Sequence, residues 1–100
     1  MNTQEAKLHQ MVRGILVRNY VDTQKIEVQV IGSSVYIEGE FYIFDYQPAR
    51  EKKDRVERDM GAKRALLHIE QQIRGLAEVS YLEVKLANWE RVGTQWQAKH

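Results

Sequence analysis

The side chains that could carry out acid–base chemistry are few in this sequence, and they are scattered. Glu38 and Glu40 are two residues apart, so on a strand their carboxyl groups would share one face, as a general acid and base would require. The same spacing suits the solvated face of a sheet, which we favour. His9, His68 and His100 are not spaced as metal ligands on one helix, and no Ser–His–Asp group is readable. The sequence therefore predicts no catalytic residue, no metal ligand and no cofactor.

Recognition of anions is suggested by a charged run at positions 50–64, which holds seven basic and four acidic residues. Acidic residues precede basic ones by four positions in this run, a spacing that supports an exposed, salt-bridged helix. A helical arm is expected from Pro48 to Gly61, projecting from the core, with a kink where Gly61 joins the next helix. The basic side chains that could meet nucleic acid or anionic lipid are the candidate anion-binding residues: Arg50, Lys52, Lys53, Arg55 and Arg58.

Three tyrosines, Tyr36, Tyr42 and Tyr81, are expected on the outer face of a sheet, with Phe44 beside them. Aromatic rings on a sheet can stack on nucleic-acid bases, pair across strands or form a dimer face. No cluster of lysine or arginine interleaves with these rings. We therefore favour a structural role or self-association over nucleic-acid binding.

Both tryptophans belong to a tail at residues 88–100. Trp89, Val92 and Trp96 follow the i, i+3, i+7 spacing that would form one apolar stripe on a helix. Gly93 disfavours a helix, so an irregular tail or an extension of the third strand is an alternative. Indole rings are too large to leave in water, and the tail should dock on its own core or on a neighbouring chain. Trp89 and Trp96 therefore join the tyrosines as a candidate interaction surface.

Most of these side chains would be positioned by a hairpin that spans residues 24–44. Apolar and polar residues alternate in two runs, 26–30 and 35–43, which is the period of half-buried strands. Gly32 opens a Gly-Ser-Ser turn between the runs, so the two strands should pair antiparallel. Gly39 interrupts the apolar row of the second strand, where a bulge or the close approach of another backbone is expected.

Two amphipathic helices and a third strand should complete the domain. Apolar residues recur at helical spacing over 3–19, where Thr3 is the expected N-cap, and again over 62–76. Gly75 is expected to end the second helix in a left-handed conformation. Alternation over 79–87 predicts the third strand. The predicted fold class is α+β, a two-layer αββαβ sandwich in which two helices pack on one face of a three-stranded mixed sheet.

The composition is that of a single small globular domain. The chain has 100 residues, of which 43% are hydrophobic and 29% charged, and a net charge of +1. This charge gives no overall field to attract nucleic acid or an acidic membrane. No cysteine is present, no signal peptide is visible, and no apolar run reaches the ~20 residues of a transmembrane helix. A cytoplasmic location is therefore expected.

This order of elements, with these residues, resembles the BON domain family. The family pattern consists of alternating valines, a turn Gly, an apolar-x-apolar-x-Gly run and a Gly-Val pair before the last strand. The residues that resemble it are Val28, Val30, Val35, Ile37, Gly39, Phe41, Gly75, Leu76 and Val79. The resemblance covers about residues 6–45 and 60–87. It implies one BON-like domain over 1–100, with a charged helical insertion at about 46–61 and the tail at 88–100. It also implies a non-enzymatic adaptor, because BON-like domains bind membrane phospholipid or other proteins.

We therefore expect a non-enzymatic interaction module for protein–protein contact or self-association, with a homodimer as one form. Two alternatives are kept, namely nucleic-acid binding by the basic run at 50–64 and weak binding to anionic phospholipid. Nucleic acid is the less favoured partner, because four acidic residues interleave with the basic ones.

Overall fold

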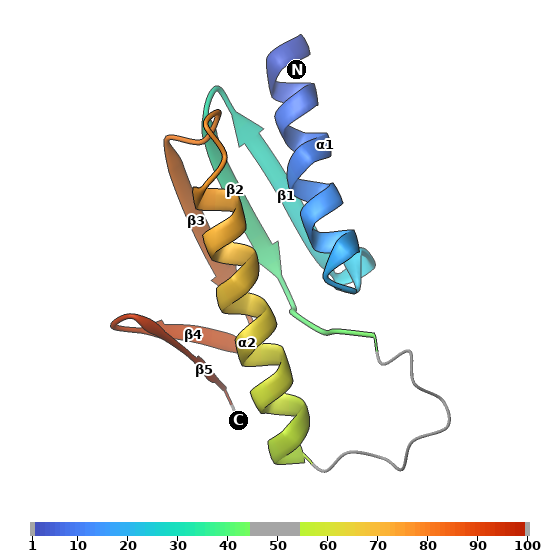
Figure 1. The fold of residues 1–100 in the computed structure, drawn as a ribbon, viewed down its shortest axis with the longest axis vertical. Helices are drawn as coiled ribbons and strands as arrows, with labels where there is room; N and C mark the ends of the chain where they lie inside the picture. The colour runs from blue at the N-terminus through green and yellow to red at the C-terminus, as the bar shows by residue number, and fades with distance from the viewer. Residues whose placement is uncertain (1, 45–54, 100) are drawn as a thin grey trace.

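The computed structural model describes residues 2–44 and 55–99, and it forms two helices, a three-stranded sheet and a separate small hairpin (Figure 1). The predicted order αββαβ is confirmed, and the C-terminal hairpin follows it. The elements in chain order are α1 (Thr3–Arg18), a short 3₁₀ turn η1 (Thr23–Lys25), β1 (Ile26–Ile31), β2 (Ser34–Gly39), α2 (Arg55–Arg74), β3 (Tyr81–Leu86), β4 (Trp89–Val92) and β5 (Gln95–Ala98).

β2 is the central strand of the sheet, and its two neighbours pair with it in different ways. β1 is antiparallel to β2, and β3 is parallel to it. A parallel neighbour requires a crossover connection, and α2 provides it. Figure 1 shows α1 running alongside β1, while α2 lies in front of β2 and β3. The predicted two-layer sandwich is therefore confirmed.

The hairpin at 26–39 has the predicted register. Val28 lies opposite Ile37, and Val30 opposite Val35, and all four side chains are buried. Gly32 has a φ of 62° at the first central position of the two-residue turn, where a side chain would be strained.

Gly39 is the point at which another part of the chain comes close, as predicted. Its φ is 128°, and a Cβ atom there would collide with the carbonyl oxygen of Lys25. The chain at Lys25 can therefore approach residue 39 this closely only because that residue has no side chain.

The ends of the helices differ in detail from the prediction. The N-cap of α1 is Asn2 rather than Thr3, since Asn2 and Glu5 form a reciprocal capping box. α2 is one helix through Gly61, where the charged arm was predicted to join the core helix. Gly75 does not have the predicted left-handed conformation; the chain leaves α2 through a hydrogen bond from the Leu76 N–H to the Ile73 carbonyl. The predicted arm at 48–61 lies partly outside the described residues, and its described part belongs to α2.

The core fills the space between the two helices and the inner face of the sheet. The apolar stripe of each helix and the alternate residues of each strand meet there, as their periods require. Phe41, which lies just after β2, is one of the largest side chains in this core and is 2% exposed. The buried residues of the helices and the sheet in this core are Leu8, Val12, Ile15 and Leu16 of α1, Leu66, Ile69 and Ile73 of α2, and Ile26, Val28, Val30, Val35, Ile37, Leu82 and Leu86 of the sheet.

Candidate functional site

Tyr36 of β2 and Tyr81 of β3 form a small aromatic patch on the face of the sheet that points away from the helices. Their ring centroids are 5.9 Å apart, and the rings are tilted by 58° to each other. The register places Tyr81 opposite Ser34, so the two rings occupy diagonal positions on neighbouring strands. Tyr81 is 49% exposed. The patch is therefore accessible to a partner.

The charged side chains around this patch are mainly acidic. On the same face, Glu27 lies opposite Glu38, and Glu38 lies opposite Lys85. Glu83 is the neighbour of Tyr36 on β3. Carboxylates at three of these four positions would repel a phosphate backbone. The aromatic patch therefore suits a protein partner better than a stack of bases.

Tyr42, the third predicted tyrosine, does not join the patch. It lies beyond the end of β2, six positions after Tyr36 along the chain. Its hydroxyl donates to Oε2 of Glu40 at 2.8 Å, and Nζ of Lys25 lies 5.5 Å from its ring centroid. The hydrogen bond to the Glu40 carboxylate and the charge of that group raise the pKa of Tyr42. Tyr42 therefore belongs to a separate polar cluster.

The two tryptophans are buried in the protein's own core, which is one of the two ways in which the tail was predicted to dock, and they are therefore not accessible as an interaction surface. Trp89 is 5% and Trp96 2% exposed. The tail is not a helix, because Gly93, with a φ of 63°, turns it into the β4–β5 hairpin. In that hairpin Val92 points to the opposite face from Trp89 and is 54% exposed, so the predicted apolar stripe does not form.

An ion pair between a buried carboxylate and a partly exposed guanidinium ties the β4–β5 hairpin to α2. The Glu70 side chain is only 6% exposed, and its Oε2 atom accepts from Nη1 of Arg91 on β4 and lies 3.8 Å from Nη2 of Arg74. The Arg91 guanidinium also lies 5.7 Å from the ring of Trp96. Our sequence analysis missed this pair, because neither spacing nor composition brings residues 70 and 91 together.

Asn88 joins the hairpin to the sheet, and it too was missed. Its Nδ2 donates to the carbonyl of Phe41 and its Oδ1 accepts from the N–H of Phe41, both at 2.9 Å. The amide side chain thus forms the two hydrogen bonds that a backbone residue of a neighbouring strand would form. It extends the hydrogen bonding between β2 and β3 beyond the bond from the Ala87 N–H to the Gly39 carbonyl. The C-terminal hairpin is therefore held at both layers of the sandwich.

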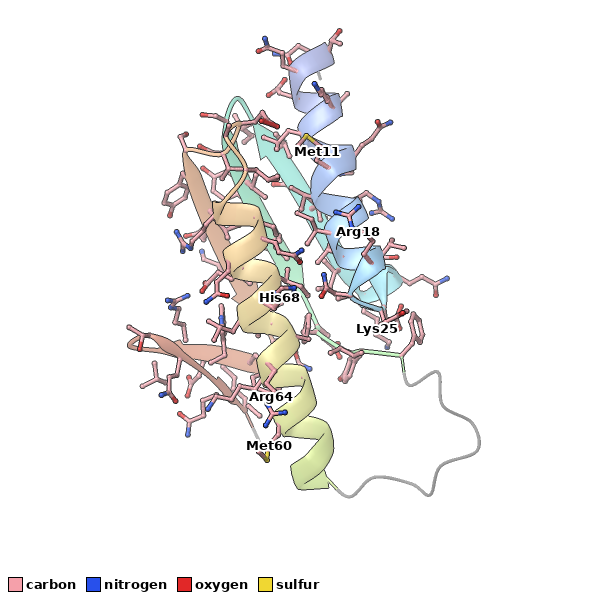
Figure 2. All side chains as sticks on the ribbon, viewed as in Figure 1. Met11, Arg18, Lys25, Met60, Arg64 and His68 are labelled. Carbon is pink, nitrogen blue, oxygen red and sulfur yellow. The ribbon has the colours of Figure 1, made fainter. Side chains whose placement is uncertain are left out.

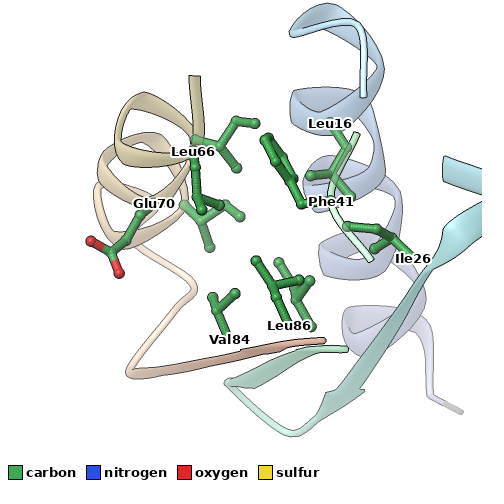
Figure 3. A pocket seen from close by; sticks show the side chains of 10 residues that line it. Leu16, Ile26, Phe41, Leu66, Glu70, Val84 and Leu86 are labelled. Carbon is green, nitrogen blue, oxygen red and sulfur yellow. The ribbon is translucent and has the colours of Figure 1, made fainter. Parts of the chain in front are cut away.

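A cavity between α2 and the sheet lies within the core and is too small to be a ligand site (Figure 3). Its volume is about 10 Å³, near the smallest that could hold one water. Aliphatic and aromatic side chains form its walls, and the Glu70 carboxylate points away from it in Figure 3. We interpret it as a packing gap.

Two side chains of α1 bind backbone groups at the β1 edge of the sheet. His9 places Nε2 3.1 Å from the Val28 carbonyl, where a ring N–H would donate to a backbone group on the free side of β1. Oε2 of Glu5 accepts from the Gly32 N–H at 2.7 Å, in the turn next to this edge. Backbone hydrogen bonds from Asn2 and Gly32 hold the pKa of Glu5 below its ordinary value. Two side chains of α1 thus bind backbone groups that would otherwise be available to hydrogen-bond a strand from another chain.

The opposite edge, at β3, has no neighbouring strand within residues 2–44 and 55–99. β3 pairs with β2 through the backbone groups of its odd-numbered residues, as the bond from Ala87 to Gly39 shows. The N–H and C=O groups of Leu82, Val84 and Leu86 therefore point away from β2. This leaves a strand of six residues whose outer edge can accept another strand.

The candidate anion-binding residues receive little further description from the structure. Arg50, Lys52 and Lys53 lie outside the described residues, and Arg55 and Arg58 are placed in the first turns of α2 by their backbone alone. Anion binding at these positions therefore stays a prediction.

The histidines do not come together where they are described. His68 is exposed on the front of α2 in Figure 2, whereas His9 is turned toward β1. Within the described part of the chain, no three His, Asp or Glu side chains are grouped closely enough to hold a metal ion. Neither described helix combines the length and the hydrophobicity that crossing a lipid bilayer demands.

Comparison of the chain with protein-family models, curated proteins and solved structures finds no match in any of the three. The resemblance to the BON family therefore stays a prediction.

Proposed function

We propose that this chain is a non-enzymatic interaction module, which binds a protein partner by adding an extended strand to the β3 edge of its sheet. Strand addition uses backbone hydrogen bonds for affinity and alternate side chains for specificity. The observation that carries the proposal is the unpaired outer side of Tyr81–Leu86, next to an accessible pair of tyrosines, in the part of the chain that is described. The adaptor role that the BON resemblance implies points in the same direction.

The side chains of β3 offer a partner strand two different faces. Tyr81, Glu83 and Lys85 lie on the outer face, where they can contact aromatic and charged residues. Val84, between Leu82 and Leu86 on the helix side, is only partly buried, so an added strand would cover it further. The partner strand should therefore be apolar on one face and charged on the other.

A peptide-binding experiment tests this proposal. The ¹⁵N-labelled protein is titrated with ten-residue peptides selected from a display library, and amide chemical shifts are followed. Peptides that bind should shift the amides of Leu82, Val84 and Leu86, while the amides of β1 stay unchanged. Binding that shifts only residues remote from β3 would contradict strand addition at this edge.

A substitution that removes one outward N–H isolates the backbone contribution. Val84→Pro deletes this donor on the free side of β3 and should lower peptide affinity about tenfold or more, since one of the partner's hydrogen bonds is lost and the strand is obstructed. Val84→Ala is the matched control, because it also removes the valine side chain but keeps the N–H. Equal affinities of the two variants would show that the backbone edge is not used.

A further inference from the structure

We infer that the strand added to β3 comes from a second copy of this chain, so that two β3 strands pair antiparallel about a two-fold axis at Val84. This inference rests on the proposed function and names its partner. The two three-stranded sheets would join into one continuous sheet with all helices on the same face. The sequence and the register of β3 support this pairing.

The hydrogen-bonding groups of β3 limit the possible registers. Only the backbone groups of Leu82, Val84 and Leu86 face outward, so these residues must lie opposite one another in the two copies. With the axis at Val84, Leu82 faces Leu86 of the second copy, and Val84 faces Val84. All three residues of each strand are then hydrogen-bonded across the axis. This register uses the full length of both strands.

The charges on the outer face select the same register. If the axis passed through Glu83, two carboxylates would face each other, and at Lys85 two ammonium groups would do so. With the axis at Val84, Glu83 of each copy faces Lys85 of the other copy, once on each side of the axis. The strand Tyr81–Leu86 is therefore complementary in charge to itself in only this one of the three central registers.

The position of the β4–β5 hairpin is compatible with this pairing. Arg91 ties the hairpin to Glu70 of α2 and Asn88 ties it to Phe41 beside the sheet, but its strands form a sheet of their own, so among the described residues no strand pairs with the outer edge of β3. In Figure 1 it extends past β3 on the side where the second copy would lie. A strand pair alone buries less area than a stable dimer usually needs. The exposed face of the hairpin, including Val92, is available to supply the rest.

Two single charge reversals test the inference by sedimentation equilibrium. Wild-type protein should self-associate to twice its chain mass of 11.8 kDa. Glu83→Lys places like charges opposite each other at both sides of the axis, and so does Lys85→Glu. Each should weaken self-association about tenfold or more, because two favourable cross-strand pairs become two repulsive ones.

Mixing the two variants distinguishes the register from general effects of charge. In the mixed dimer the lysine introduced into one variant faces the glutamate introduced into the other. On the second side of the axis, the Glu83 that one variant retains faces the Lys85 that the other retains, so the dimer should return. Glu27→Lys, on the outer face of β1, is the matched control and should leave the dimer intact. Melting temperatures of all variants confirm that each is folded before its mass is interpreted.

Each possible result supports or overturns the inference. Recovery of the dimer on mixing supports pairing at the Val84 register. Dimers that persist in both single variants, or a mixture that stays monomeric, would overturn that register. A wild-type protein that is monomeric at millimolar concentration would overturn self-pairing altogether. The proposed function would still stand in that case if peptides shifted the β3 amides, and it would fail separately if they did not.

Discussion

At the β1 edge of the sheet, side chains of α1 bind the Val28 carbonyl and the N–H of Gly32 in the adjoining turn, whereas the β3 edge has no neighbouring strand among the described residues. An unpaired strand edge invites association with other chains, and proteins usually obstruct it with helices, charges or short strands. Here one helix supplies His9 and Glu5 to backbone groups at one edge. The other edge carries only the ordinary alternation of Glu83 and Lys85. This contrast is the reason why the proposed function places association at β3 rather than at β1.

The largest effect is expected in the core that holds both edges in place. Leu66 is 3% exposed on α2 above β3, whereas its neighbour Leu67 is 38% exposed. Leu66→Ala should lower the free energy of unfolding by about 2–5 kcal/mol, through lost burial and the cavity left behind. Leu67→Ala, the matched control, should change it by less than about 1 kcal/mol. Urea denaturation gives both values, and equal losses would mean that α2 is packed on a different face.

The next effect concerns the contact between the β4–β5 hairpin and α2, beside the open edge. Arg91→Met removes a guanidinium from the buried Glu70 carboxylate and leaves Arg74 at 3.8 Å as its remaining cationic neighbour among the described residues. Because Arg91 is itself partly exposed, we expect a loss of about 1–3 kcal/mol rather than the full cost of a buried charge. Glu90→Gln, on the exposed face of the same strand, is the control. A neutral Arg91→Met variant would show that the hairpin is held by its tryptophans alone.

Removing the cover from the β1 edge should have a smaller effect on stability and a qualitative effect on association. His9→Ala frees the Val28 carbonyl and should cost about 1 kcal/mol. It should also slightly increase self-association at high concentration, since both edges are then less obstructed. Gln10→Ala, one residue further along α1, should change neither property. If His9→Ala leaves stability unchanged, the side chain does not cover this edge.

The smallest expected effect is the pH dependence of the stability that the Glu5 carboxylate contributes at the β1 edge. Its pKa in the folded protein lies below the ordinary value of 4.5, because the carboxylate accepts hydrogen bonds from the Asn2 and Gly32 N–H groups. The stabilisation it gives is therefore complete above the ordinary pKa and is lost as the pH falls through the folded pKa. In an NMR titration the Gly32 amide should shift in that acidic range, and Glu5→Gln should abolish the shift. A Glu5 titration at or above the ordinary pKa would contradict these hydrogen bonds.

The hairpin and the layer arrangement could be predicted because they depend on local patterns. A period of two determines which residues of β1 and β2 face the core, and Gly32 determines their turn. The tail could not be predicted in the same way, since the seven-residue spacing of Trp89 and Trp96 would place both on one side of a helix. They also suit one face of a hairpin that turns at Gly93. Whether the tail forms a helix or a hairpin depends on the space beside α2, and that space is a result of the tertiary fold.

The candidate site was only partly predictable for a related reason. Tyr36 and Tyr81 could be assigned to the outer face from alternation alone. Their contact, however, requires β3 to lie parallel beside β2, and the order of strands is not encoded in any short stretch of sequence. The cover of β1 by His9 and the pairing of Glu70 with Arg91 likewise join residues that are far apart along the chain. Such contacts follow from the fold and not from spacing.

Hydrogen exchange at single amides of β3, measured by NMR at several protein concentrations, tests the central claim most directly. In dilute solution the N–H of Val84, which points outward, should exchange rapidly, while the N–H of Lys85, which is bonded to β2, should be protected. At high concentration the Val84 amide should become protected as the second copy pairs with it, and the amides of β1 should not change. A Val84 amide that is protected at every dilution, or unprotected at every concentration, would contradict the account.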